Sequence, residues 1–86
     1  MKISELKKLG FKKTHITKEE SGEDAFDYYT LEIGDDYEKF CLISKEVINK
    51  EIEYVELFNY TSFRFTTIKD IKVLIDILNI SIYNKI

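Results

Sequence analysis

The spacing of apolar residues changes along this chain, and the change limits what the chain can fold into. Between residues 12 and 66 apolar side chains recur mostly at every second position, which is the period of a half-buried strand. From residue 68 to residue 78 they recur every three or four positions, which is the period of a helix packed on a core. A short helical segment at residues 4–9 precedes the strands. This order of elements predicts an α+β fold.

Five strands are predicted between the two helices. Their ranges are 12–17, 26–33, 39–44, 51–58 and 63–66. Short polar segments separate them, around Gly22, Gly34, Asn49-Lys50 and Asn59. Short turns favour pairing between consecutive strands, so the five strands are expected to form an antiparallel β-meander.

Capping residues mark both helices. Ser4 is the expected N-cap of the first, and Gly10 is expected to take the left-handed position after its last turn, with Phe11 folding back. Thr67 and Asp70 resemble a capping box at the start of the second. An apolar stripe is expected to pack this C-terminal amphipathic helix across one face of the sheet. The stripe comprises Ile68, Ile71, Val73, Leu74, Ile75, Ile77 and Leu78.

The composition is that of an ordinary globular domain. No linker or repeat divides the 86 residues, of which 44% are hydrophobic and 34% charged, so residues 1–86 are expected to form a single domain. No apolar stretch approaches the roughly 20 residues of a membrane span, and no signal peptide opens the chain. The lone Cys41 excludes an internal disulfide and a cysteine metal cage. We therefore expect a cytoplasmic protein with no membrane partner, metal or cofactor.

Charge is divided unevenly, although the net charge is only −3. Residues 1–18 carry six lysines and one glutamate, whereas residues 19–38 carry nine acids and no base. The acids gather in two predicted turns at opposite ends of the second strand. They are Glu19, Glu20, Glu23 and Asp24 in one turn and Asp35, Asp36 and Glu38 in the other. Such acidic tips either keep the protein soluble or bind a basic surface, such as a nucleic-acid groove, on another protein.

A sheet covered by helices on one face leaves its other face open. Tyr28 and Tyr54, together with Phe58, Tyr60 and Phe63, are expected on that open face. Exposed aromatic surface is typical of a partner site or a homodimer interface. The tail, which fits both a strand and a continued helix, is a second candidate for self-association. Its apolar row comprises Ile80, Ile82 and Ile86.

Few residues are suited to catalysis. His15 is the only histidine, and its place on a strand supplies no partner by spacing. Cys41 lies between Phe40 and Leu42, where a thiol behaves as a small hydrophobe. The sequence contains no glycine-rich phosphate loop and no metal-ligand spacing. We therefore expect no enzymatic activity.

The segments ISELKKLGF, FDYYTLEIG and FTTIKDIKVLIDILN resemble small proteins encoded by AT-rich phages and mobile elements, and twelve lysines against one arginine fit that codon bias. The resemblance implies a protein that binds and blocks a host component, as CRISPR inhibitors do. A short helix, a hairpin and one histidine are also similar to small ribonuclease toxins of the HicA-like kind. That resemblance implies that His15 is catalytic, but the GSHH-like context of those toxins is absent.

The whole sequence predicts a small non-catalytic protein-binding module that acts through its acidic turns or its aromatic sheet face. Inhibition of a host defence protein by a phage protein is the sharpest form of this prediction. The alternative is a small RNA-binding or ribonuclease protein that uses His15 and the N-terminal lysines. The acidic block and the net charge of −3 oppose nucleic-acid binding.

Overall fold

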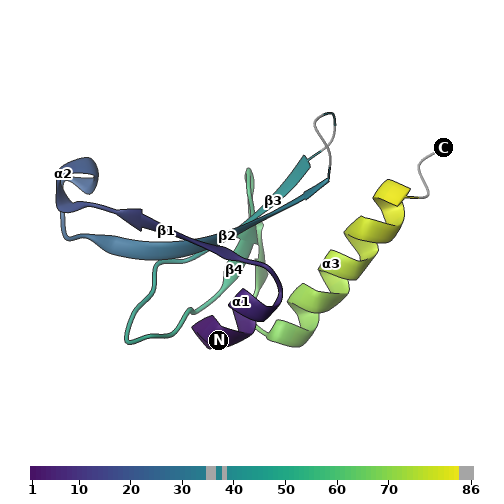
Figure 1. The fold of residues 1–86 in the computed structure, drawn as a ribbon, viewed down its shortest axis with the longest axis horizontal. Helices are drawn as coiled ribbons and strands as arrows, with labels where there is room; N and C mark the ends of the chain where they lie inside the picture. Colours follow the sequence, from purple (N-terminus) through teal and green to yellow (C-terminus); the bar gives the residue numbers. More distant parts are fainter. Residues whose placement is uncertain (35–36, 38, 84–86) are drawn as a thin grey trace.

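The computed structural model describes residues 1–34, 37 and 39–83. Its elements follow one another in the order α1 (Ile3–Lys8), β1 (Lys12–Ile16), α2 (Lys18–Ser21), β2 (Phe26–Gly34), β3 (Lys39–Ser44), β4 (Val55–Leu57), β5 (Tyr60–Phe65) and α3 (Ile68–Tyr83). The strands form one antiparallel sheet in the order β1-β2-β3-β4-β5, and α3 packs on it (Figure 1). The predicted α+β fold, with a short first helix, a five-stranded meander and a C-terminal helix on the sheet, is confirmed.

The register of the strands divides the sheet into a core face and an open face. Lys12, Thr30, Ile43, Glu56 and Arg64 stand opposite one another across all five strands, and none of them is fully buried. Because side chains alternate along a strand, their neighbours point to the other face. Those neighbours form the core together with side chains of α1, α3 and two connecting segments. The buried hydrophobic residues are Leu6, Phe11, Tyr29, Ile33, Leu42, Ile52, Val55 and Ile71.

The end of α1 follows the prediction, but its start does not. Gly10 has φ of +101°, its N–H donates to Lys7 O (3.0 Å), and the Phe11 N–H donates to Leu6 O (3.1 Å). This is the Schellman arrangement, in which the residue after glycine packs back on the helix. The N-cap is Lys2 rather than Ser4, and its side chain makes no capping hydrogen bond. Lys2 pairs instead with Glu51 in an isolated β-bridge, so the helix begins directly after an extended N-terminus.

The fourth strand is shorter than predicted, because residues 45–54 leave the sheet. The Lys45 N–H donates to Tyr54 O (3.0 Å), after which the chain turns at Asn49-Lys50, both with positive φ. Ile52 then pairs with Met1, its N–H donating to Met1 O (2.9 Å). In a strand over residues 51–58, Ile52 and Val55 would point to opposite faces of the sheet. Both are buried, so the predicted alternation is wrong at Ile52.

The last strand and the last helix close the fold. β5 begins at Tyr60 rather than at Phe63, because the turn occupies only residues 58 and 59, and the register against β4 shifts between Glu56 and Leu57. The Asp70 N–H donates to Thr67 Oγ1 (3.2 Å), which confirms Thr67 as the cap.

α3 continues to Tyr83, so the tail is helical up to that residue, and Ile86 lies outside the described residues. Val73 and Ile77 are 49% and 53% exposed, so they do not belong to the buried stripe as predicted. None of the helices in the described part of the chain has the length and hydropathy needed to cross a membrane.

Candidate functional site

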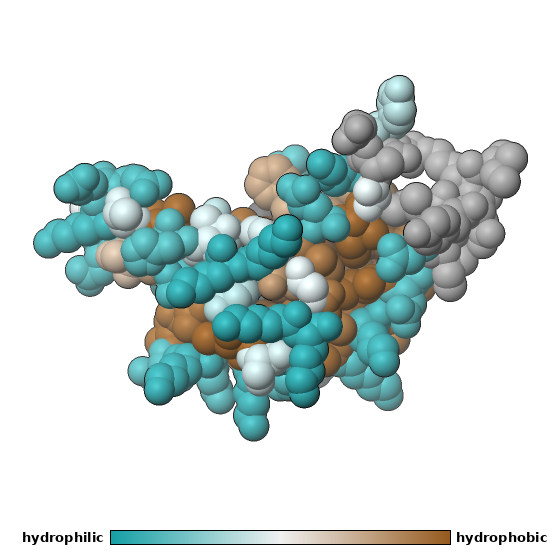
Figure 2. Space-filling model, in the orientation of Figure 1, coloured by the Kyte–Doolittle hydropathy of each residue, from teal (hydrophilic) through white to brown (hydrophobic). Residues whose placement is uncertain are grey.

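The first group of predicted acidic residues forms an acidic tip, which we define as Glu19, Glu20, Glu23 and Asp24. All four residues are exposed. They belong to α2 and the loop after it, at one end of a molecule that extends 46 × 26 × 23 Å along its principal axes (Figure 1). Hydrophilic side chains cover most of this end, whereas apolar side chains gather over the middle of the same view (Figure 2). The acidic tip therefore projects from the apolar body of the molecule.

Local hydrogen bonds hold the backbone of the acidic tip. The Glu20 N–H donates to Thr17 Oγ1 (3.2 Å), whose hydroxyl donates to Glu20 Oε1 (3.0 Å). At the other end of α2, Gly22 has φ of +75° and its N–H donates to Lys18 O (3.0 Å). The Ser21 hydroxyl accepts from the Glu23 N–H (3.0 Å) and donates to Asp24 O (3.2 Å). The expected polar turn is thus a single capped helical turn.

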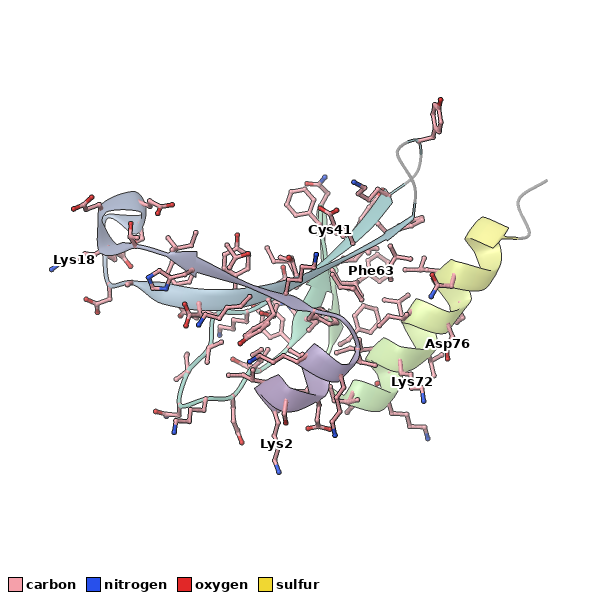
Figure 3. The ribbon with its side chains drawn as sticks, in the orientation of Figure 1. Lys2, Lys18, Cys41, Phe63, Lys72 and Asp76 are labelled. Carbon is pink, nitrogen blue, oxygen red and sulfur yellow. The ribbon has the colours of Figure 1, made fainter. Side chains whose placement is uncertain are left out.

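The carboxylates of the acidic tip are not neutralised by ion pairs within the described part of the chain. Lys18 projects at the same end (Figure 3) but pairs with none of them. Two basic residues of β1 contact Asp27 instead. Lys13 Nζ lies 3.9 Å from Asp27 Oδ2, and His15 Nδ1 lies 2.6 Å from Asp27 Oδ1. The acidic tip therefore keeps a strong negative field.

For the second predicted acidic turn, the structure describes the residues on either side of it but not its acids. Asp35, Asp36 and Glu38 fall outside the described residues. The residues that flank them, Gly34 and Lys39, pair with each other at the end of β2 that lies away from α2 (Figure 1).

Charged side chains of the chain itself lie against part of the predicted aromatic face. Tyr54 lies under two cations, with Lys45 Nζ at 5.5 Å and Arg64 Cζ at 4.5 Å from the ring centroid. Lys45 also bonds Glu53 (2.8 Å), which raises the pKa of Lys45 and lowers the pKa of Glu53. The other predicted tyrosine, Tyr28, is half-buried, and its ring centroid lies 6.2 Å from that of Phe26.

Two members of the predicted aromatic face are on the other side of the sheet. Phe63 alternates with Arg64 along β5, so it points to the core side together with Phe65. Tyr60 pairs with Leu57, which follows Glu56 of the open face, so Tyr60 is on the core side as well. Two cations of the open face also form ion pairs, Arg64 with Glu56 (3.3 Å) and Lys39 with Glu32 (3.4 Å). Much of the charge on the open face is therefore neutralised within the chain.

The groups with chemical reactivity do not converge. His15 bonds Asp27 on an exposed part of the hairpin, and sequence reasoning missed Asp27 because only the strand register sets the two opposite. Cys41 lies on β3 (Figure 3), and burial, followed by the charge of Glu32, raises the pKa of its thiol. A raised thiol pKa leaves little thiolate at neutral pH. Within the described ranges no cluster of side chains suits a metal ion.

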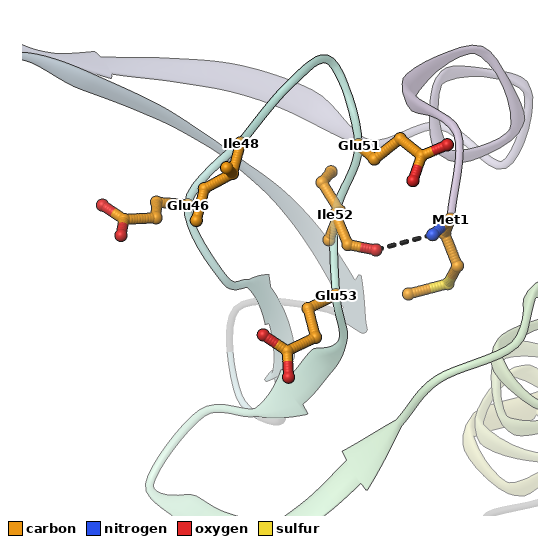
Figure 4. A pocket seen from close by; sticks show the side chains of 6 residues that line it. All are labelled: Met1, Glu46, Ile48, Glu51, Ile52 and Glu53. Atoms are coloured by element: carbon orange, nitrogen blue, oxygen red, sulfur yellow. Dashed lines mark hydrogen bonds between the residues drawn. The ribbon is translucent and has the colours of Figure 1, made fainter.

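A hollow of about 330 Å³ lies beside the N-terminus (Figure 4). Its walls combine apolar side chains with carboxylates, and the Met1 amino group donates to Ile52 O (2.6 Å) within it. The lining residues are Met1, Glu46, Ile48, Glu51, Ile52 and Glu53. No imidazole, thiol or hydroxyl side chain is among these lining residues.

Comparison of this chain with models of protein families, with curated proteins and with solved structures found no match.

Proposed function

We propose that this chain is a non-catalytic protein-binding module that presents its acidic tip to a basic surface on another protein. The observation that carries the proposal is the set of four exposed carboxylates, held on a capped turn at one end of the molecule and without ion pairs in the described part of the chain.

Electrostatics gives the acidic tip two advantages in binding. Its field steers a basic partner into encounter, which raises the association rate at low ionic strength. The four acids also repel one another in the free protein, and a row of lysines or arginines relieves that repulsion. The affinity should therefore fall as salt is added.

The partner is best described by its chemistry, a concave surface lined with lysine and arginine. Where such a surface normally holds nucleic acid, the carboxylates take the place of phosphates and the chain acts as a competitive inhibitor. The phage-type inhibitor of a host defence protein is this form of the proposal. The open face fits such a partner less well, because Lys39, Lys45 and Arg64 already have acidic partners there.

The proposal is tested by capturing partners on the immobilised chain and comparing two pairs of substitutions. Glu19→Gln with Glu23→Gln removes two charges from the acidic tip, and Glu46→Gln with Glu51→Gln removes two exposed charges elsewhere. We expect the first pair to weaken binding of a basic partner by about 10-fold or more, as for a charged interface contact, and the second to leave it unchanged.

Nuclease treatment separates the proposal from the alternative. A basic protein that survives nuclease and binds both pairs of variants equally well contradicts a role for the acidic tip. The RNA-binding or ribonuclease alternative is favoured by one observation, the 2.6 Å contact that orients His15 against Asp27. Capture of RNA, lost on nuclease treatment, would support that alternative instead.

A further inference from the structure

The two edges of the sheet differ in how they are protected. β1 carries Lys12, Lys13 and His15, all exposed, and lysines on an edge strand discourage pairing with another strand. β5 is the other edge, and its exposed side chains include Tyr60 (58%) and Phe63 (57%). β5 carries the register shift against β4, but its exposed aromatic residues still favour the addition of a further strand.

Apolar exposure continues from β5 onto α3. A groove of about 410 Å³ separates the two elements, and its lining residues are Arg64, Phe65, Asp70, Val73, Leu74 and Ile77. In Figure 3, Phe63 lies between the strands and α3, and its ring centroid is 6.3 Å from that of Tyr60. We define the apolar edge as the half-exposed residues of this region. They are Phe58, Tyr60, Phe63, Val73 and Ile77.

We propose that the apolar edge is the contact surface of a homodimer, in which β5 pairs with β5 of a second copy. A two-fold axis through the edge joins the two sheets and sets α3 antiparallel to its counterpart on the same face. Val73 and Ile77 of one copy then meet the same residues of the other, and the unpaired backbone groups of β5 are satisfied. This surface is separate from the acidic tip, so the proposal does not depend on the proposed function.

The exposed area is of the size that a dimer requires. A fully exposed aromatic side chain presents about 200 Å², so the apolar edge leaves on the order of 450 Å² of apolar surface in water. A stable interface buries about 800 Å² per partner, of which more than half is apolar. The backbone of β5 and the polar residues around it supply the remainder.

Charge favours a second copy over a partner of strong charge. Residues 58–77 carry three basic and two acidic side chains, so the surface selects neither an acidic nor a basic partner. The apolar edge is thus complementary to itself in hydropathy, and its nearly balanced charge does not oppose a second copy.

Sedimentation velocity of the full chain over a wide concentration range tests this proposal. We expect a monomer–dimer equilibrium, and Phe63→Lys should raise its dissociation constant about 10-fold or more because it buries a charge in the interface. Val73→Lys should do the same from α3. Ile48→Lys is the control, since Ile48 is equally exposed (54%) but lies in the loop between β3 and β4.

Two results would overturn the proposed homodimer. One is a wild-type chain that stays monomeric at every concentration, and the other is a dimer that both lysine variants leave intact. Circular dichroism checks that the variants fold, and Val73→Lys decides the question if Phe63→Lys does not fold.

Discussion

Ser44 is the one buried polar residue of the described chain, at 6% exposure, and its hydroxyl takes the place of a backbone hydrogen-bond partner. Pairing between β2 and β3 ends at Thr30 opposite Ile43, where the strands diverge. The next N–H along β2, that of Tyr29, donates to Ser44 Oγ (2.8 Å), and the Ser44 hydroxyl donates to Lys45 O (2.9 Å). One side chain therefore satisfies two backbone groups at the point where the ladder stops.

Removing this hydroxyl should destabilise the fold. Ser44→Ala leaves the buried Tyr29 N–H without its partner, and we expect a loss of about 1–3 kcal/mol in the free energy of unfolding. Ser62→Ala, at an exposed position of β5, is the matched control and should change stability by less than about 0.5 kcal/mol. Urea titration measures both values. Equal stabilities of the two variants would show that water replaces the hydroxyl.

The Lys45–Glu53 pair makes stability depend on pH in two directions. Because the pKa of Glu53 is lowered in the folded chain, its contribution is present above the unfolded pKa of glutamate and is lost as pH falls through the folded pKa. Because the pKa of Lys45 is raised, its contribution is present below the unfolded pKa of lysine and is lost at higher pH. Both side chains are exposed, so the effect is small and sensitive to salt.

We expect wild type to have a slightly higher Tm than Glu53→Gln at neutral pH and low salt. That difference should disappear in acid, where Glu53 is protonated. Glu19→Gln is the control, because Glu19 is exposed and has no ion pair in the described part of the chain. A difference that persists in acid would mean that Glu53 acts through packing and not through its charge.

At the scale of elements, α3 depends on its N-cap, the residue directly before its first turn. Thr67 caps the helix through the Asp70 N–H, and Thr66 precedes it without such a bond in the described structure. We expect Thr67→Ala to lower the free energy of unfolding by about 1 kcal/mol and Thr66→Ala to have a much smaller effect. Thermal unfolding followed by circular dichroism compares the two. A larger loss in Thr66→Ala would contradict the assignment of the cap.

Elements that are encoded locally were predictable, and those held by distant backbone were not. The Gly10 stop of α1 and the Thr67 start of α3 rest on residues within one turn of the helix end, so the sequence pattern reveals them. The departure of residues 45–54 from the sheet rests on bonds between Ile52 and Met1, which lie 51 positions apart. No periodicity records such a contact, and the alternation over 51–58 therefore predicted a full strand.

The acidic tip was predictable in composition but not in form. Acids around Gly22 indicate a polar turn, and the spacing of Thr17 and Glu20, which is that of a capping box, was the signal for a helical turn. Asp27 gave no signal, because a carboxylate on a strand usually indicates no more than a solvent-exposed position. Its contact with His15 follows only from the pairing of β1 with β2.

At the scale of the whole molecule, the protein is one sheet with α1 and α3 on a single face, and its two candidate surfaces are far apart. The acidic tip ends the hairpin of β1 and β2 at one edge of the sheet, whereas the apolar edge belongs to β5 at the other. Eight buried hydrophobic residues of the described chain form the core between them. Substitutions at the two surfaces should therefore have additive effects on the free energy of unfolding of the monomer.

The order of the strands has a consequence for valency. In a dimer joined through β5, the two β1–β2 hairpins become the outermost parts of the assembly, and each carries an acidic tip. A target with one basic groove would bind a single arm, but a target with repeated grooves would hold both arms at once. The second contact would then form at a high effective concentration, and avidity would exceed the affinity of either arm by about 10²–10⁴-fold where the spacing of the grooves matches.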